Sequence, residues 1–189
     1  MFRAVGFVVV IVVVVGAAAL GYARVTGLRA AATPAPLEAA LARSVRRFAV
    51  PDADRTRPNP VPASAEAMAA GMAHFADHCA SCHANDGSGD TSLGRGMFPP
   101  PPDMRQAPTQ AMTDGELFFA IEQGIRFTGM PAFGSGEEHA AESWELVHFI
   151  RHLPRLSAAE IEKMRDLNPR SAAEIRQEIE EERFLRGEP

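Results

Sequence analysis

The sequence predicts an all-α fold with long loops, and three observations support this prediction. Apolar residues recur at three- and four-residue spacing in several segments, as they do on one face of a helix. No segment alternates apolar and polar residues for long enough to indicate a β-strand. Fifteen glycines and fifteen prolines, many of them clustered between the helical segments, indicate ordered loops rather than a sheet-rich sandwich.

The composition already excludes several classes of protein. The chain has 189 residues, which is enough for one domain of roughly 100–150 residues with attached segments. Its net charge of −5 argues against a nucleic-acid-binding protein, which should carry a basic face. Two cysteines are too few for a scaffold held together by disulfides.

Residues 1–23 are expected to form a transmembrane anchor. Ala4–Ala23 contains no charged residue, and at about 1.5 Å per residue a helix of this length crosses a hydrocarbon core of roughly 30 Å. A cleaved signal peptide is the alternative, because Ala17–Ala19 contains an Ala-x-Ala pattern. The apolar stretch is longer than the roughly 7–15 residues of a signal-peptide core, which favours the anchor. Both interpretations export the rest of the chain.

The charges around this segment leave its orientation ambiguous by the positive-inside rule. Arg3 favours a cytoplasmic N-terminus, but a larger group of arginines follows the apolar stretch: Arg24, Arg29, Arg43, Arg46 and Arg47.

Residues 24–63 are rich in alanine, arginine and proline and are predicted to be a tether. A short helix is expected over Leu37–Ala49, where apolar residues recur at helical spacing. Four prolines between positions 51 and 62 break regular structure. The tether either extends away from the domain or folds partly back on it.

Residues 64–154 are predicted to form the globular domain. Ser64 is a plausible N-cap of a first helix, whose apolar stripe is Met68, Met72, Phe75 and Cys79. A capping box from Thr113 to Glu116 begins a second helix that ends at Gly124. A third helix is expected from about Glu142 to Leu153, with Pro154 ending it.

Residues 155–189 are predicted to be a charged helical extension. Ser157 and Ser171 each begin a Ser-Ala-Ala-Glu-Ile sequence, which is a capping box that opens a helix. The second helix is densely charged, and we interpret it as solvated and weakly packed on its own domain. The alternative is a docking arm for a partner protein.

The strongest motif is Cys79-Ala80-Ser81-Cys82-His83, a Cys-x-x-Cys-His pattern typical of covalent c-type haem attachment. Two thiols separated by two residues can each form a thioether with a haem vinyl group, and the next imidazole then points at the iron. A thioredoxin-like pair would need a strand before the motif, and a zinc site would need four Cys or His ligands. One covalently attached haem c is therefore the expected cofactor.

Haem c attachment takes place on the outer side of the bacterial cytoplasmic membrane. We therefore expect a single-pass protein with its N-terminus in the cytoplasm and its haem domain in the periplasm. A long translocated domain overrides the arginine excess after residue 23.

Met130 is the candidate for the second iron ligand. It lies in Gly129-Met130-Pro131, where Pro131 disfavours helical backbone at Met130 and Gly129 permits close approach. The alternative is that Met130 only packs, as methionines often do. The rivals Met97, Met104 and Met112 lack the Gly-Met-Pro setting.

On these motifs, residues 64–154 resemble a single-haem class I c-type cytochrome. Further matching features are Gly71-x-x-x-Phe75-x-x-x-Cys79, Thr128–Phe133 and Trp144–Ile150. The resemblance implies that Gly71 lets the first helix cross closely over the last, with Phe75 meeting Leu146 and Phe149. It also implies that a carbonyl of Pro100, Pro101 or Pro102 accepts a hydrogen bond from the His83 imidazole. Ala84 departs from the family, where many members have glycine.

Other candidate residues carry weaker predictions. The pairs His74/His78 and His148/His152 have the i,i+4 spacing of a metal site, but solvent exposure is the favoured interpretation of the second pair. His78 is a minor candidate for tuning the haem environment. Haem propionates are expected near a further group of residues: Asp90, Arg95 and Arg126.

The predicted function is transfer of single electrons between a membrane or periplasmic donor and acceptor, alone or as a subunit of a respiratory or dehydrogenase complex. His and Met ligation would saturate the iron and raise its reduction potential. The chain is then an electron carrier and not itself an enzyme. Its acidic balance predicts a redox partner with a basic docking patch. The alternatives are a haem-based sensor or catalyst with an accessible sixth site, and a scaffold whose working part is the C-terminal helices.

Overall fold

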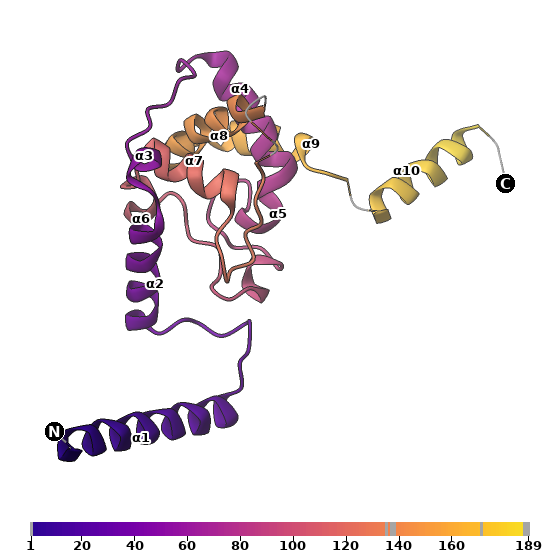
Figure 1. The fold of residues 1–189 in the computed structure, drawn as a ribbon. Coiled ribbons are helices and arrows are strands. Elements are labelled where there is room, and N and C mark those ends of the chain that lie inside the picture. The colour runs from indigo at the N-terminus through magenta and orange to yellow at the C-terminus, as the bar shows by residue number, and fades with distance from the viewer. Residues whose placement is uncertain (1, 135, 137–138, 171, 187–189) are drawn as a thin grey trace.

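The computed structural model describes residues 2–134, 136, 139–170 and 172–186, and these form helices and loops without a strand, so the all-α prediction is confirmed (Figure 1). The helices, in chain order, are α1 (Phe2–Thr26), α2 (Pro36–Ala49), α3 (Asp52–Arg55), α4 (Ala65–His74), a π-helical turn (Phe75–Cys79), α5 (Ala80–His83), a 3₁₀ turn (Gly94–Gly96), α6 (Ala107–Gln110), α7 (Asp114–Gln123), α8 (Ala140–His152), a second 3₁₀ turn (Leu153–Arg155), α9 (Ala158–Leu167) and α10 (Ala172–Leu185).

Helix α1 fits a membrane anchor. Its segment Val5–Thr26 has 22 residues and a mean hydropathy of 2.6, so it is long and apolar enough to cross a bilayer. Its valines are more than half exposed, and Figure 1 shows the helix away from the other helices. The helix continues three residues beyond the predicted end at Ala23.

The core of the domain is built where α4 crosses α8. A Cβ atom on Gly71 would lie 2.2 Å from the backbone oxygen of Glu145, so only glycine permits the two backbones to come this close. The Phe75 and Phe149 rings then meet with centroids 5.1 Å apart. This close crossing and the Phe75–Phe149 contact were expected from the family resemblance. The largest fully buried side chains are Trp144, Phe75, Phe149, Leu146, Leu153, Met164 and Val147.

The predicted caps of the domain helices are confirmed. Ser64 Oγ accepts a hydrogen bond from Ala67 N at 3.1 Å at the start of α4. At the start of α7, Thr113 Oγ1 accepts from Glu116 N, and Thr113 N donates to the Glu116 carboxylate at 2.8 Å. Gly124 ends α7 with a φ of 66°. Helix α8 begins at Ala140, two residues before the predicted start.

Residues 50–61, from the segment predicted as a tether, pack on the domain. A Cβ on Gly115 would lie 1.9 Å from Asp54 O, so α3 rests directly on the first turn of α7. Thr113 Oγ1 donates to Arg55 O at 2.7 Å. The Arg57 guanidinium lies 4.7 Å from the centroid of the Phe118 ring, which itself stacks on Trp144. The sequence did not predict α3.

Helix α9 docks on the domain through a fully buried Met164. Asn168 Nδ2 donates to Ala76 O at 2.8 Å, three residues before the Cys-x-x-Cys-His motif. The predicted capping box at Ser157 and Glu160 is confirmed, and it lowers the pKa of Glu160 to about 2, chiefly through the hydrogen bond from Ser157. Figure 1 shows α10 beyond the end of α9, apart from the other helices, and Ser171 lies outside the described residues.

The expectation that His148 and His152 face solvent is wrong. His148 Nε2 lies 2.8 Å from Val61 O and 3.2 Å from Asn59 Nδ2, because residues 59–61 fold over α8. His152 Nε2 lies 2.8 Å from the Glu160 carboxylate, because α9 covers the end of α8. Both rings belong to the contacts that hold the flanking segments on the domain.

Replacing Gly71 by alanine should destabilise the fold. The new methyl group overlaps the backbone of Glu145, which cannot move aside as a flexible side chain could. Overpacking of this kind costs about 1–3 kcal/mol. Denaturant unfolding of Gly71→Ala measures this loss. Gly96→Ala is the matched control, because a Cβ there meets no atom within 4 Å. Equal stability of the two variants would contradict the close crossing.

Candidate functional site

The Cys-x-x-Cys-His motif, residues 79–83, lies where the first domain helix changes its winding. Helix α4 passes into a π-helical turn at Phe75–Cys79 and then into α5, which ends at His83. A π turn holds one more residue than an α turn, so it rotates the following side chains relative to the α4 stripe. The motif therefore follows a local irregularity, which is a frequent feature of functional sites.

The two thiols of the motif are free and half-buried. Cys79 packs against the core beside the π turn, and neither cysteine is in a disulfide. Burial, with a smaller effect of Cys82, raises the pKa of the Cys79 thiol to about 12. Both sulfur atoms are thus available three residues apart, Cys79 at the end of the π turn and Cys82 within α5, as attachment to two vinyl groups requires.

His83 has the properties of an iron ligand. Burial lowers its pKa to about 4, so the imidazole is neutral at physiological pH, which is the form that binds metals. Its ring centroid lies 6.5 Å from that of Phe75, and its Nδ1 is buried without a hydrogen-bond partner within the described part of the chain. The expected hydrogen bond to a carbonyl of Pro100, Pro101 or Pro102 is therefore not formed in this structure.

The loop after the motif folds back on it through backbone contacts. Gly89 N donates to His83 O at 2.8 Å, and Thr91 Oγ1 donates to Cys82 O at 3.2 Å. A Cβ on Gly89 would lie 2.6 Å from Pro101 O, so this turn and the proline-rich loop are in close contact. The proline-rich loop therefore lies beside the motif, as the resemblance implies.

Ala84 adopts a backbone conformation that only glycine adopts readily. Its φ is 59° and its ψ is 157°, a region in which the alanine Cβ clashes with its own backbone. This is the position where the sequence departs from the family that it resembles. The departure leaves the turn in place but makes it strained.

The loop that carries Met130 is a tight turn fixed at both ends. Ile125 N donates to Met130 O at 3.1 Å, and Met130 N donates to Thr128 Oγ1 at 3.2 Å. Phe133 N donates to Ile121 O at 3.0 Å, which ties the end of the loop to α7. Met130 is half-buried against the same core cluster that Cys79 contacts.

The rival methionines fall into two groups. Met104 and Met112 are buried within the hydrophobic core. Met97 differs, because its sulfur would lie 2.7 Å from a Cβ on Gly129, so it packs against the residue that precedes Met130. The sequence could not show this contact, since it joins two loops 32 positions apart. Met97 is therefore the rival that a test of Met130 must include.

The candidates for propionate binding lie on the surface, and the candidate metal-binding histidines lie close together without further ligands among the described residues. Asp90 and Arg95 form an ion pair with each other on the surface, and Arg126 is exposed. The His74 and His78 rings touch with centroids 4.9 Å apart, and His78 lies 3.2 Å from Asp77. Within the described residues, no group of three or more His, Cys, Asp or Glu side chains is arranged to hold a metal ion.

Sequence reasoning missed Arg105, which holds the loop that follows the prolines. Its guanidinium donates to Asp103 Oδ1 and Asp86 Oδ2, each at 2.8 Å. The hydrogen bond from Arg105 lowers the pKa of Asp103 to about 2. The spacing Asp103-x-Arg105 is common in loops, so nothing in the sequence distinguished it.

These residues fit a c-type haem. The observation that supports the fit is the neutral His83 imidazole, whose buried Nδ1 has no hydrogen-bond partner among the described residues. It directly follows Cys82 in α5 and comes four residues after Cys79, and both thiols are free. Together with the helical fold, this defines a c-type cytochrome domain. Residues 66–150 match the family model described as cytochrome c oxidase, cbb3-type, subunit III, and this domain belongs to the cytochrome c family. No curated protein matches the chain.

Replacing Ala84 by glycine should stabilise the protein. Relief of the positive φ outweighs the entropy that glycine gains in the unfolded chain, for a net gain of about 1 kcal/mol. Denaturant unfolding with the haem attached measures the change. The matched control is Ala69→Gly, on the exposed side of α4, which should lose about 1 kcal/mol. A loss in both variants would show that the Ala84 turn is unstrained.

Proposed function

We propose that this chain is a single-haem c-type cytochrome that transfers one electron at a time between redox proteins. In this proposal Cys79 and Cys82 attach the haem, and His83 and Met130 are its two iron ligands. The main support for this proposal is the neutral His83 imidazole, which directly follows the free thiol of Cys82 in α5 and comes four residues after the free thiol of Cys79. The cytochrome c family indicates haem-based electron transfer in general terms.

The chain's own residues perform distinct tasks in this function. Each cysteine thiol adds across one vinyl double bond: the sulfur bonds one carbon, the thiol hydrogen goes to the other, and no oxidant is needed. His83 supplies a neutral nitrogen ligand from a half-buried position. A bound haem would supply a one-electron Fe(II)/Fe(III) couple.

The loop residues around Met130 position the second ligand. The hydrogen bond from Met130 N to Thr128 and the link from Phe133 to α7 hold the loop at both ends. A thioether ligand in an apolar setting favours the reduced state more than a second nitrogen ligand does. With His83 and Met130 both bound to its iron, a haem held here would have no open position for a substrate, which supports a carrier rather than an enzyme.

The proposal also includes where the protein is located and which kind of partner it binds. With α1 as a single-pass anchor, the haem domain faces the periplasm of a bacterial cell and works in a respiratory chain, alone or as a subunit of an oxidoreductase complex. The net charge of −5 favours a donor or acceptor with a basic docking patch. The charged helix α10 is a candidate docking element for a partner subunit.

Carbon monoxide binding tests the second ligand. The reduced wild-type protein should show no change in its visible spectrum on adding carbon monoxide, because Met130 occupies the sixth position. Met130→Ala should respond clearly. Met97→Ala is the matched control, since Met97 packs beside Gly129, and it should behave as wild type.

Two results would contradict the proposal. A response in the wild-type protein would show an accessible iron and favour a haem-based sensor or catalyst. A response in Met97→Ala with none in Met130→Ala would transfer the ligand role to Met97.

A further inference from the structure

Helix α2 has an apolar face that nothing in the described part of the chain covers. Pro36 at the first helical position and the Glu38 carboxylate, which accepts from Ala35 N at 3.3 Å, begin this helix. None of its 14 residues is buried. The apolar side chains recur on one face, and all are more than half exposed: Leu37, Leu41, Val45 and Phe48.

The charge around α2 is opposite to that of the chain as a whole. Residues 24–49 contain five arginines and one glutamate, whereas the full chain has a net charge of −5. These arginines are the excess that the positive-inside rule does not expect on an exported segment. Their position needs an explanation other than topology.

The connection to α1 keeps α2 close to the place where the chain would leave a membrane. Nine residues separate Thr26 from Pro36. A fully extended chain covers at most about 3.4 Å per residue, so over these ten steps the start of α2 lies within about 34 Å of the end of α1. A strongly amphipathic, arginine-bearing helix of modest overall hydrophobicity is typical of helices that lie in a membrane interface.

We propose that α2 lies in the membrane interface beside α1, with its apolar face toward the acyl chains and the nearby arginines among anionic lipid headgroups. This goes beyond electron transfer and rests on α1 as the anchor. A second copy of the chain would cover the apolar face equally well but would not account for the arginines, since it carries the same charges.

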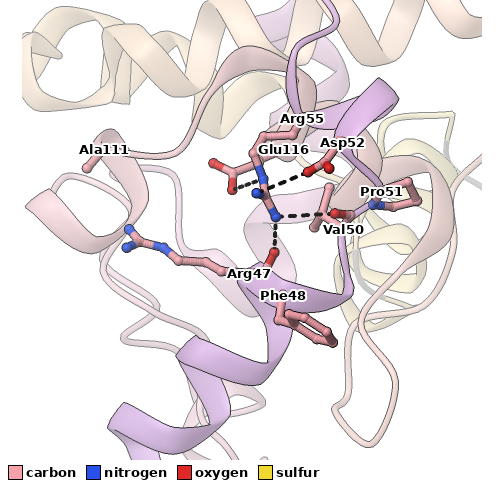
Figure 2. Close-up of a pocket in the computed structure, with 8 residues that line it drawn as sticks. All are labelled: Arg47, Phe48, Val50, Pro51, Asp52, Arg55, Ala111 and Glu116. Carbon is pink, nitrogen blue, oxygen red and sulfur yellow. Dashed lines mark hydrogen bonds and ion pairs between the residues drawn. The ribbon is translucent and has the colours of Figure 1, made fainter.

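Contacts just after α2 join this helix to the domain, so its placement on the membrane would also position the domain. Val50 is buried, and Arg55 donates to Val50 O at 3.2 Å and to Arg47 O. Arg55 also pairs with Glu116 of α7 at 3.5 Å (Figure 2). In the same view, Phe48 and Arg47 leave α2 in different directions. A helix fixed on the membrane and joined to the domain in this way would hold the haem site at a set height and orientation.

Photo-crosslinking of the full-length holoprotein in lipid vesicles tests the proposal. Benzoylphenylalanine, which forms bonds with nearby C–H groups under ultraviolet light, replaces Phe48 in one variant. It replaces Ala42, on another side of the same helix, in the control. We expect lipid adducts at position 48 to exceed those at position 42 several-fold. The excess should be larger with phosphatidylglycerol than with phosphatidylcholine alone.

Three outcomes would overturn the proposal. Equal lipid adducts at the two positions would show that α2 has no membrane-facing side. Adducts between two copies of the chain at position 48 would make the apolar face a dimer interface. Equal adducts in both kinds of vesicle would remove the role of the arginines. None of these outcomes affects the haem ligands, which the carbon monoxide experiment tests separately.

Discussion

The close approach of α4 and α8 at Gly71 is the constraint on which the rest of the domain depends. Because the backbones come together at one glycine, Phe75 reaches Phe149 and the following π turn is held against the core. The motif begins at the end of that turn, so the crossing also sets where the two thiols and the His83 imidazole lie. Burial of this helix end then keeps the imidazole neutral.

The features that the sequence predicted are those determined by short-range patterns. Ser64, Thr113 and Gly124 begin or end helices through local hydrogen bonds and backbone conformation, and the structure confirms them. The Cys-x-x-Cys-His motif is equally local. The close contact at Gly71 was predicted only through family resemblance, because its partner lies 74 positions away.

The features that the sequence did not predict arise from contacts between distant segments. His148 and His152 lie off the apolar stripe of α8, which indicated solvent, but residues 59–61 and α9 cover them. Helix α3 has only four residues and too few apolar positions to show a period. The contact between Met97 and Gly129 joins two loops, and no periodicity relates positions within loops.

The segments before and after the domain both pack on it, each at a different place. The α2–α3 junction is tied to α7 through Arg55 and Glu116, and α9 is tied to the motif region through Asn168 and Ala76. Both ends of the domain are thus braced by segments outside the family match at residues 66–150. Such bracing would limit the motion of the haem site relative to α1.

Covalent attachment of one haem is tested most directly by the mass of the intact chain under denaturing conditions, after expression in cells that attach c-type haem. We expect a mass equal to that of the polypeptide plus one haem, because addition of two thiols to two vinyl groups loses no atoms. A chain with Cys79 and Cys82 both replaced by serine should show the polypeptide mass alone. A wild-type chain without the added mass would contradict covalent haem attachment.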